Sequence, residues 1–149
     1  MYNDLDVVTD DDSLFVGFTV YQSQPRNYSE GERVEFDSVV TNYGAHYSTS
    51  NHTFRCPVPG FYIFFVTVMN TNDHGAELDI ILNDDTRLAV AYARDLGIFH
   101  QAANAAVTYC GAGDVVWGKS RQEGDELHGF PDFSYTSFSG ALLQRVPPN

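Results

Sequence analysis

The five histidines are the residues best suited to metal or acid–base chemistry, and their spacing supports neither. They are His46, His52, His74, His100 and His128. No two are spaced as in His-x-x-x-His, the pattern that places two metal ligands on one helix face. The sequence also has no Gly-x-Ser-x-Gly nucleophile elbow and no glycine-rich phosphate-binding loop. We therefore expect a binding protein that requires no cofactor, rather than an enzyme.

Residues 123–135 suggest a different chemistry, because this segment is long, polar and aromatic. Carbohydrate sites combine a flat aromatic face for the C–H surface of a sugar with planar polar groups for its hydroxyls. His128, Asp132 and Tyr135 supply both types of group. A second polar segment, residues 70–75, contributes Asp73 and His74. The alternative is that both segments are ordinary hydrophilic connections.

The charge of the chain limits its partners. Eight Lys and Arg residues face 20 Asp and Glu residues, for a formal charge of -12. This charge argues against nucleic acid and anionic membranes as partners. The sequence shows no membrane-spanning stretch and no basic-then-apolar leader, so we expect no membrane insertion. Either a signal peptide has been removed, or the sequence starts at the mature domain with an added Met1. Glycosylation sequons at Asn27 and Asn51 suit a secreted protein.

The elements that position these residues are expected to be strands. Short alternating runs separated by Gly, Pro, Asn and Asp are typical of an all-β sandwich or barrel. An acidic lead-in, residues 1–13, precedes a single globular domain, residues 14–146. The clearest strands are predicted at residues 14–20, 34–40, 61–68, 77–82, 87–94, 105–110, 115–119 and 138–143.

The strand predicted at residues 61–68 is apolar on both faces. A strand of an antiparallel sandwich commonly has one face in water, so a strand with two apolar faces needs a second cover. Another subunit is the simplest source of that cover. Loops of the same chain are the alternative.

Residues 36–64 contain a spaced set of aromatic, amide and glycine residues, namely Phe36, Asn42, Tyr47, Phe54 and the run Gly60-x-Tyr62-x-Phe64. This set resembles the signature of the complement C1q globular-head family. Similar matches lie at residues 18–20, 113–117 and 138–143, so the resemblance covers roughly residues 14–145. Val66 stands where the signature usually has an aromatic residue. No Gly-x-y repeat precedes the domain. The chain thus resembles the head-only secreted members, which are numerous in bivalve molluscs.

The resemblance implies a ten-stranded jelly roll of the C1q and tumour-necrosis-factor type that assembles as a homotrimer. Three subunits would pack through their inner sheets and would cover residues 61–68. Three chains at -12 each would give the trimer a formal charge of -36, which would favour cations near its axis.

The resemblance also bears on calcium and on the two cysteines. Some family members bind Ca²⁺ through the loop before the strand that is predicted here to begin at Ala105. In this chain that loop offers Asp95 and Gln101 as oxygen ligands, although it does not match the family's ligands residue by residue. The family's strand order places Cys56 and Cys110 at the same end of the sheet. They would be either a disulfide in a secreted protein or two buried thiols.

Three functions follow from the resemblance. The first is a secreted, lectin-like pattern-recognition protein of innate immunity, which binds glycans or microbial surface polysaccharides with the avidity of a trimer. The second is an adaptor or ligand for a protein receptor. The third is a structural component of an extracellular fluid.

Overall fold

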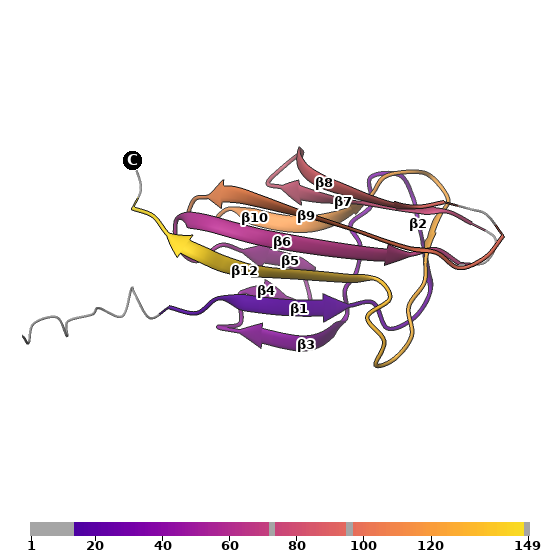
Figure 1. Ribbon diagram of the computed structural model, residues 1–149, viewed down its shortest axis with the longest axis horizontal. Coiled ribbons are helices and arrows are strands. Elements are labelled where there is room, and N and C mark those ends of the chain that lie inside the picture. The colour runs from indigo at the N-terminus through magenta and orange to yellow at the C-terminus, as the bar shows by residue number, and fades with distance from the viewer. Residues whose placement is uncertain (1–13, 72–73, 95–96, 148–149) are drawn as a thin grey trace, which may run out of the picture.

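The computed structural model describes residues 14–71, 74–94 and 97–147, and these residues form twelve strands and no helix. Ten strands make two five-stranded antiparallel sheets (Figure 1). Sheet 1 has the order β3 (Ser38–Tyr43), β1 (Gly17–Tyr21), β12 (Ser137–Arg145), β6 (Gly60–Met69) and β9 (Gln101–Cys110). Sheet 2 has the order β4 (Tyr47–Ser48), β5 (Thr53–Arg55), β10 (Val115–Ser120), β7 (Ala76–Leu82) and β8 (Thr86–Ala93). The short strands β2 (Arg26–Tyr28) and β11 (Asp125–Leu127) pair with each other.

The chain crosses repeatedly between the two sheets. It leaves sheet 1 after β3 for β4 and β5, returns for β6, and crosses again for the hairpin of β7 and β8. Strands β9, β10 and β12 then alternate between the sheets. The prediction of an all-β jelly roll is confirmed, and the ten strands of the two large sheets match the ten expected.

The sandwich has two distinct ends. At the Gly60 end of β6, called the base here, the Val146 N–H donates to the Pro59 carbonyl at 3.0 Å, so the C-terminal segment lies there (Figure 1). At the Met69 end, called the loop end, the connections after β1, β6, β8 and β11 gather. A ten-residue strand such as β6 separates the two ends by about 30 Å.

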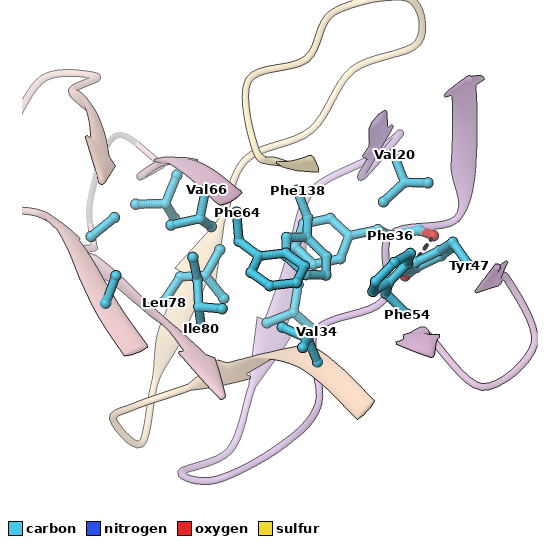
Figure 2. Close-up of a cluster of buried hydrophobic side chains, with 14 of the residues drawn as sticks. Val20, Val34, Phe36, Tyr47, Phe54, Phe64, Val66, Leu78, Ile80 and Phe138 are labelled. Carbon is cyan, nitrogen blue, oxygen red and sulfur yellow. Dashed lines mark hydrogen bonds between the residues drawn. The ribbon is translucent and has the colours of Figure 1, made fainter. Parts of the chain in front are cut away.

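Strict alternation along β6 builds the core between the sheets. Tyr62, Phe64, Val66 and Val68 are buried, whereas the residues between them are exposed or half-buried. Phe64 and Val66 meet side chains from both sheets, including Phe138 and Ile80 (Figure 2). Aromatic rings dominate this core, and Phe18 packs on Phe54 and on Phe138 with ring centroids 4.6 and 4.9 Å apart. Pairs of this kind add about 0.5–1.5 kcal/mol each to the burial of their apolar surface.

One predicted strand, residues 34–40, is wrong in its first half. Val34 and Phe36 are fully buried, so the alternation is real. However, the Val34 N–H bonds to the Gly118 carbonyl of sheet 2, whereas the residues from Ser38 onward pair with β1 of sheet 1. The segment therefore crosses between the sheets, and only its second half belongs to a continuous strand.

We expect Gly140→Ala to destabilise the fold by about 1–3 kcal/mol, because overpacking a filled core forces side chains off their preferred rotamers. A Cβ at Gly140 would lie 2.6 Å from Phe18 Cε1 and 2.7 Å from Phe64 Cδ1. The control is Gly111→Ala, where the nearest atom would be 3.6 Å away. Denaturant titration compares the two variants, and equal free energies of unfolding would contradict this view of the core.

Candidate functional site

The outer face of sheet 1 is apolar and uncovered. Phe61 and Phe65 of β6 are 44% and 47% exposed, and Val107 of the neighbouring strand β9 is 57% exposed. Phe61 also makes an edge contact with Tyr109, with ring centroids 5.8 Å apart. No described loop of the chain covers these residues, so the second apolar face expected at residues 61–68 is present and open to the solvent.

A shallow groove of about 660 Å³ runs along the same face. Phe15 and Tyr43 form one wall, with their rings in edge contact at 6.2 Å, and Phe65 lies on the other side. Phe15 is 72% exposed and Tyr43 is 65% exposed. Large exposed aromatic side chains gathered on one face in this way are typical of an interaction site.

Buried polar side chains organise the loop end. Gln22 is fully buried, where its Nε2 donates to the Leu127 carbonyl at 2.7 Å and its Oε1 accepts from the Tyr28 hydroxyl. Asn70, also fully buried, donates to the Arg94 and Ile98 carbonyls and accepts from a backbone N–H at residue 100. Buried polar groups with satisfied hydrogen bonds fix a single loop arrangement.

An aromatic column lies on these loops. We use this name for Phe99, His128, Tyr135, Phe133 and Phe130, which contact one another in that order. The His128 ring stacks on Tyr135 at 5.2 Å and 14°, and Tyr135 stacks on Phe133 at 5.2 Å and 16°. The fold thus brings together two of the predicted sugar-binding residues, His128 and Tyr135, at the centre of the column.

A tight turn presents the outer end of the column. The Phe133 N–H bonds to the Phe130 carbonyl at 3.1 Å, with Pro131 and Asp132 between them. Asp132 has a φ of 68°, which fits the third position of a type II turn. Its backbone N–H donates to the Tyr21 hydroxyl oxygen at 3.2 Å, and its side chain is exposed. Phe130 and Phe133, on either side of Pro131 and Asp132 in the sequence, are 52% and 48% exposed.

Gly129 anchors the turn to the rest of the protein. A Cβ at this position would lie 2.5 Å from the Gln22 carbonyl oxygen and 2.7 Å from the Gln24 backbone nitrogen. Because those atoms are backbone, they cannot move aside cheaply. Only glycine therefore permits this close approach.

Burial lowers the pKa of His128 below its ordinary value. The imidazole is therefore neutral at pH 7 and stacks between Phe99 and Tyr135 without placing a charge among the rings. His128 acts as a flat ring in this column, and its backbone N–H is held by the Met69 carbonyl at 2.8 Å.

Phe99, Phe130 and Phe133 were not among the residues expected to bind ligand. The sequence could have indicated Phe130 and Phe133, because they stand on either side of Pro131-Asp132, a turn sequence that places two rings side by side. No sequence pattern connects them to Phe99, which reaches the column only because Asn70 holds the neighbouring loop.

The other predicted ligand residues lie elsewhere or outside the described residues. The His74 Nδ1 lies 2.9 Å from a Glu126 carboxylate oxygen and His74 makes none of the ring contacts of the column, and Asp73 lies outside the described residues. The strand predicted to begin at Ala105 begins at Gln101, so Gln101 belongs to β9 rather than to a loop. Its Nε2 donates to the Tyr135 carbonyl at 3.0 Å.

Calcium binding stays a prediction. Asp95 lies outside the described residues, and Gln101 by itself offers one amide oxygen. Within residues 14–71, 74–94 and 97–147, no group of three or more His, Cys, Asp or Glu side chains is placed to hold a metal ion.

Cys56 and Cys110 are buried free thiols near the base. The two side chains are in hydrogen-bonding contact, and this bond, followed by burial, raises the pKa of Cys56. The sequon residues Asn27 and Asn51 are both exposed, Asn27 on β2 and Asn51 in the turn between β4 and β5. Glycosylation and disulfide formation remain predictions.

Two facing sheets with crossing connections and an open apolar face define a jelly-roll domain of the C1q and tumour-necrosis-factor type. A family model described as "C1q domain" matches residues 17–143. The chain therefore belongs to the C1q domain family, and the resemblance seen in the sequence is confirmed. Domains of this fold family bind ligands and are not enzymes. The described residues contain no helix long and apolar enough to cross a membrane.

Curated relatives agree with this assignment. The chain is 30% identical over 127 residues to mouse complement C1q tumor necrosis factor-related protein 2, a match that covers 83% of this chain and 41% of the relative. The human protein of the same name matches at 30% identity over 127 residues, covering 83% of this chain and 42% of its own length. Zebrafish Caprin-2 matches at 29% identity, covering 80% of this chain and 13% of its own length. The chain thus spans less than half of each of these relatives.

Solved structures share the fold at low sequence identity. The globular domain of zebrafish complement 1qA protein has a TM-score of 0.72 at 16% identity, covering 88% of this chain and 99% of that domain. The Eiger TNF from S. frugiperda has a TM-score of 0.74 at 12% identity, covering 90% of this chain and 96% of the Eiger chain. At these identities the likeness shows the fold alone.

Proposed function

We propose that this chain is a secreted, homotrimeric recognition protein of innate immunity, and that it binds carbohydrate through the aromatic column at its loop end. The C1q domain family includes trimeric immune and extracellular proteins. The observation that carries the glycan proposal is the pair of exposed rings, Phe130 and Phe133, which contact each other at 5.7 Å and are joined by a turn whose Asp132 side chain is also exposed.

The trimer would bury the outer face of sheet 1. Phe61, Phe65 and Val107 would then lose their exposed apolar surface, and the groove beside Tyr43 would be filled by a neighbouring copy of the chain. Apolar burial contributes about 25 cal/mol for each Å² removed from water. This face therefore supplies the driving force for assembly, while the loops at the end of β6 remain open for ligand.

The sugar site would use two kinds of group. An exposed phenylalanine ring offers a flat apolar surface to the C–H face of a pyranose ring, and the Asp132 carboxylate accepts hydrogen bonds from adjacent hydroxyls. His128 and Tyr135 hold Phe133 in place from behind through stacking. Each subunit contributes one such site, and sites linked on a rigid trimer gain about 10²–10⁴ in avidity when they engage together.

We expect Phe133→Ala to weaken binding to a responsive glycan by about tenfold per site, because it removes one ring and its apolar contact. The measurement is a screen of microbial polysaccharides and defined glycans with trimeric protein, followed by titration of the best monosaccharide. Tyr92→Ala is the matched control, since Tyr92 is an exposed aromatic residue (51%) on β8 of sheet 2 and does not belong to the column.

The screen is repeated with a calcium chelator. Loss of binding on chelation would place calcium in or beside the site, and unchanged binding would remove it from the proposal. If a trimeric sample bound none of the glycans, the carbohydrate proposal would be overturned. A protein receptor would then become the leading candidate for the ligand.

A further inference from the structure

A polar pocket of about 250 Å³ lies on the hairpin formed by β4 and β5, on the outer side of sheet 2. Ser48 and Thr53 are directly paired across this hairpin, and the Arg55 N–H bonds to the His46 carbonyl at 3.0 Å. Together with Asn51 from the turn, these residues present hydroxyl, amide, imidazole and guanidinium groups to one small space.

The Arg55 guanidinium is available for an external anion. It is held in place by one hydrogen bond, from Nη1 to the Gly113 carbonyl at 3.0 Å. Within the described residues, Arg55 forms no ion pair with a carboxylate. Four other cations do form such pairs: Arg26, Arg87, Lys119 and Arg121. A guanidinium with unused N–H groups matches the geometry of an oxyanion.

A second cation stands beside the pocket. The Arg33 guanidinium lies 4.6 Å over the Trp117 ring and donates to the Asn51 carbonyl at 3.2 Å. It too makes no ion pair with a carboxylate among the described residues. Two cations therefore flank the same turn.

The negative charge of the whole chain does not decide the potential here. Surface charges further away than about 8 Å are largely screened at physiological ionic strength. The acidic residue closest along the chain to the Gly113 contact is Asp114. Its carboxylate accepts from the Gly111 N–H at 2.8 Å and from the Asn83 side chain at 3.3 Å, so its charge is partly satisfied within its own turn.

The backbone around the pocket adopts conformations that L-residues avoid. Ala45 and His52 have φ values of 60° and 59°, and Gly44 has a φ of 86°. Such residues persist only where the surroundings hold them, and they gather at ligand sites. Gly44 and Ala45 precede β4 and His52 directly precedes β5, so left-handed backbone lies on both sides of β4.

We propose that this pocket, formed by His46, Ser48, Asn51, Thr53 and Arg55, binds an oxyanion of the sulfate or phosphate class. The site lies near the base, because Arg55 pairs with Val115 and precedes the Gly60 end of β6. It is therefore separate from the aromatic column and does not depend on the carbohydrate proposal.

Asn51 has two competing uses, because it lines the pocket and begins a sequon. A glycan attached at Asn51 would occupy the space of the anion. The test therefore uses protein made without glycosylation, and a glycosylated sample serves as an internal competitor that is expected to bind the anion less well.

The experiment is a titration with inorganic sulfate and, separately, with inorganic phosphate, followed by backbone amide NMR at constant ionic strength. We expect saturable shifts at Ser48, Thr53 and Arg55. Arg55→Ala should weaken binding about tenfold or more, Arg55→Lys should weaken it less, and Ser48→Ala should weaken it a fewfold. Arg94→Ala is the charge-matched control at the loop end and should leave binding unchanged.

The same variants are then tested on a sulfated dextran surface and on unsulfated dextran. Much tighter binding to the sulfated polymer than to free sulfate would identify a sulfated polysaccharide as the source of the anion, and equal binding would identify the small ion. Linear shifts without saturation, or equal losses in Arg55→Ala and Arg94→Ala, would overturn the proposal.

Discussion

Phe65→Asp is expected to convert the trimer into monomers and to lower apparent affinity for a glycan-coated surface by about 10²–10⁴. Phe65 lies on β6, 47% exposed at the edge of the apolar groove, where a carboxylate would be buried without a partner on assembly. An unpaired buried charge costs several kcal/mol for each subunit. The measurement is surface binding alongside sedimentation velocity.

Tyr92→Asp is the matched control, because Tyr92 is similarly exposed on β8 of sheet 2. It should remain trimeric with full avidity. Phe65→Asp should also keep its affinity for a single free monosaccharide, since the aromatic column is at the loop end. If Phe65→Asp stays trimeric, the outer face of sheet 1 is not the subunit interface.

Oxidation of Cys56 and Cys110 to a disulfide is expected to raise the free energy of unfolding by about 4 kcal/mol, because the bond would close a loop of about 55 residues in the unfolded chain. Both thiols are buried, and each is close enough to the other to shift its pKa. In the reaction the two thiols lose two protons and two electrons to a small disulfide such as oxidised glutathione, which becomes two thiols.

The measurement compares denaturant midpoints with and without a reductant, and mass spectrometry counts the free thiols. Cys110→Ser controls for the reductant and should show no difference between the two conditions. The pairing would be contradicted if both thiols could still be alkylated after the chain had been unfolded, refolded and oxidised for a long period.

Strand positions could be predicted from alternation, but sheet membership could not. The two apolar faces of residues 61–68 indicated both the core and an open surface, and the structure bears this out in Tyr62 and Phe61. The failure at residues 34–40 has a physical cause, because Val34 and Phe36 alternate as in a strand while their backbone passes from one sheet to the other.

Alternation is also a poor guide to solvent exposure in sheet 2. Glu77 and Asp79 of β7 alternate with apolar residues, which is typical of a strand with one face in water, yet Glu77 is 7% exposed and Asp79 is 1% exposed. Arg87 bonds to Asp79 at 2.8 Å and Arg121 lies 3.3 Å from Glu77, so long cationic side chains shield both carboxylates from water. Cross-strand neighbours decide this, and a single sequence does not give the register.

The spatial grouping of the loop-end residues could be predicted only in part for a similar reason, and their role in binding stays a prediction. His128, Asp132 and Tyr135 lie within eight residues of one another, so local sequence was sufficient to group them. Phe99 joins the column from a distant loop that the buried Asn70 positions. Such a contact depends on tertiary hydrogen bonds that leave no periodic signal in the sequence.

The most direct test of the proposed assembly is the mass of the unmodified protein in solution, measured by sedimentation equilibrium over a range of concentrations. Three chains of 16.6 kDa predict a single species of about 50 kDa that persists on dilution. A species of 16.6 kDa at every concentration would contradict the trimer and would leave the apolar face of sheet 1 without its proposed partner.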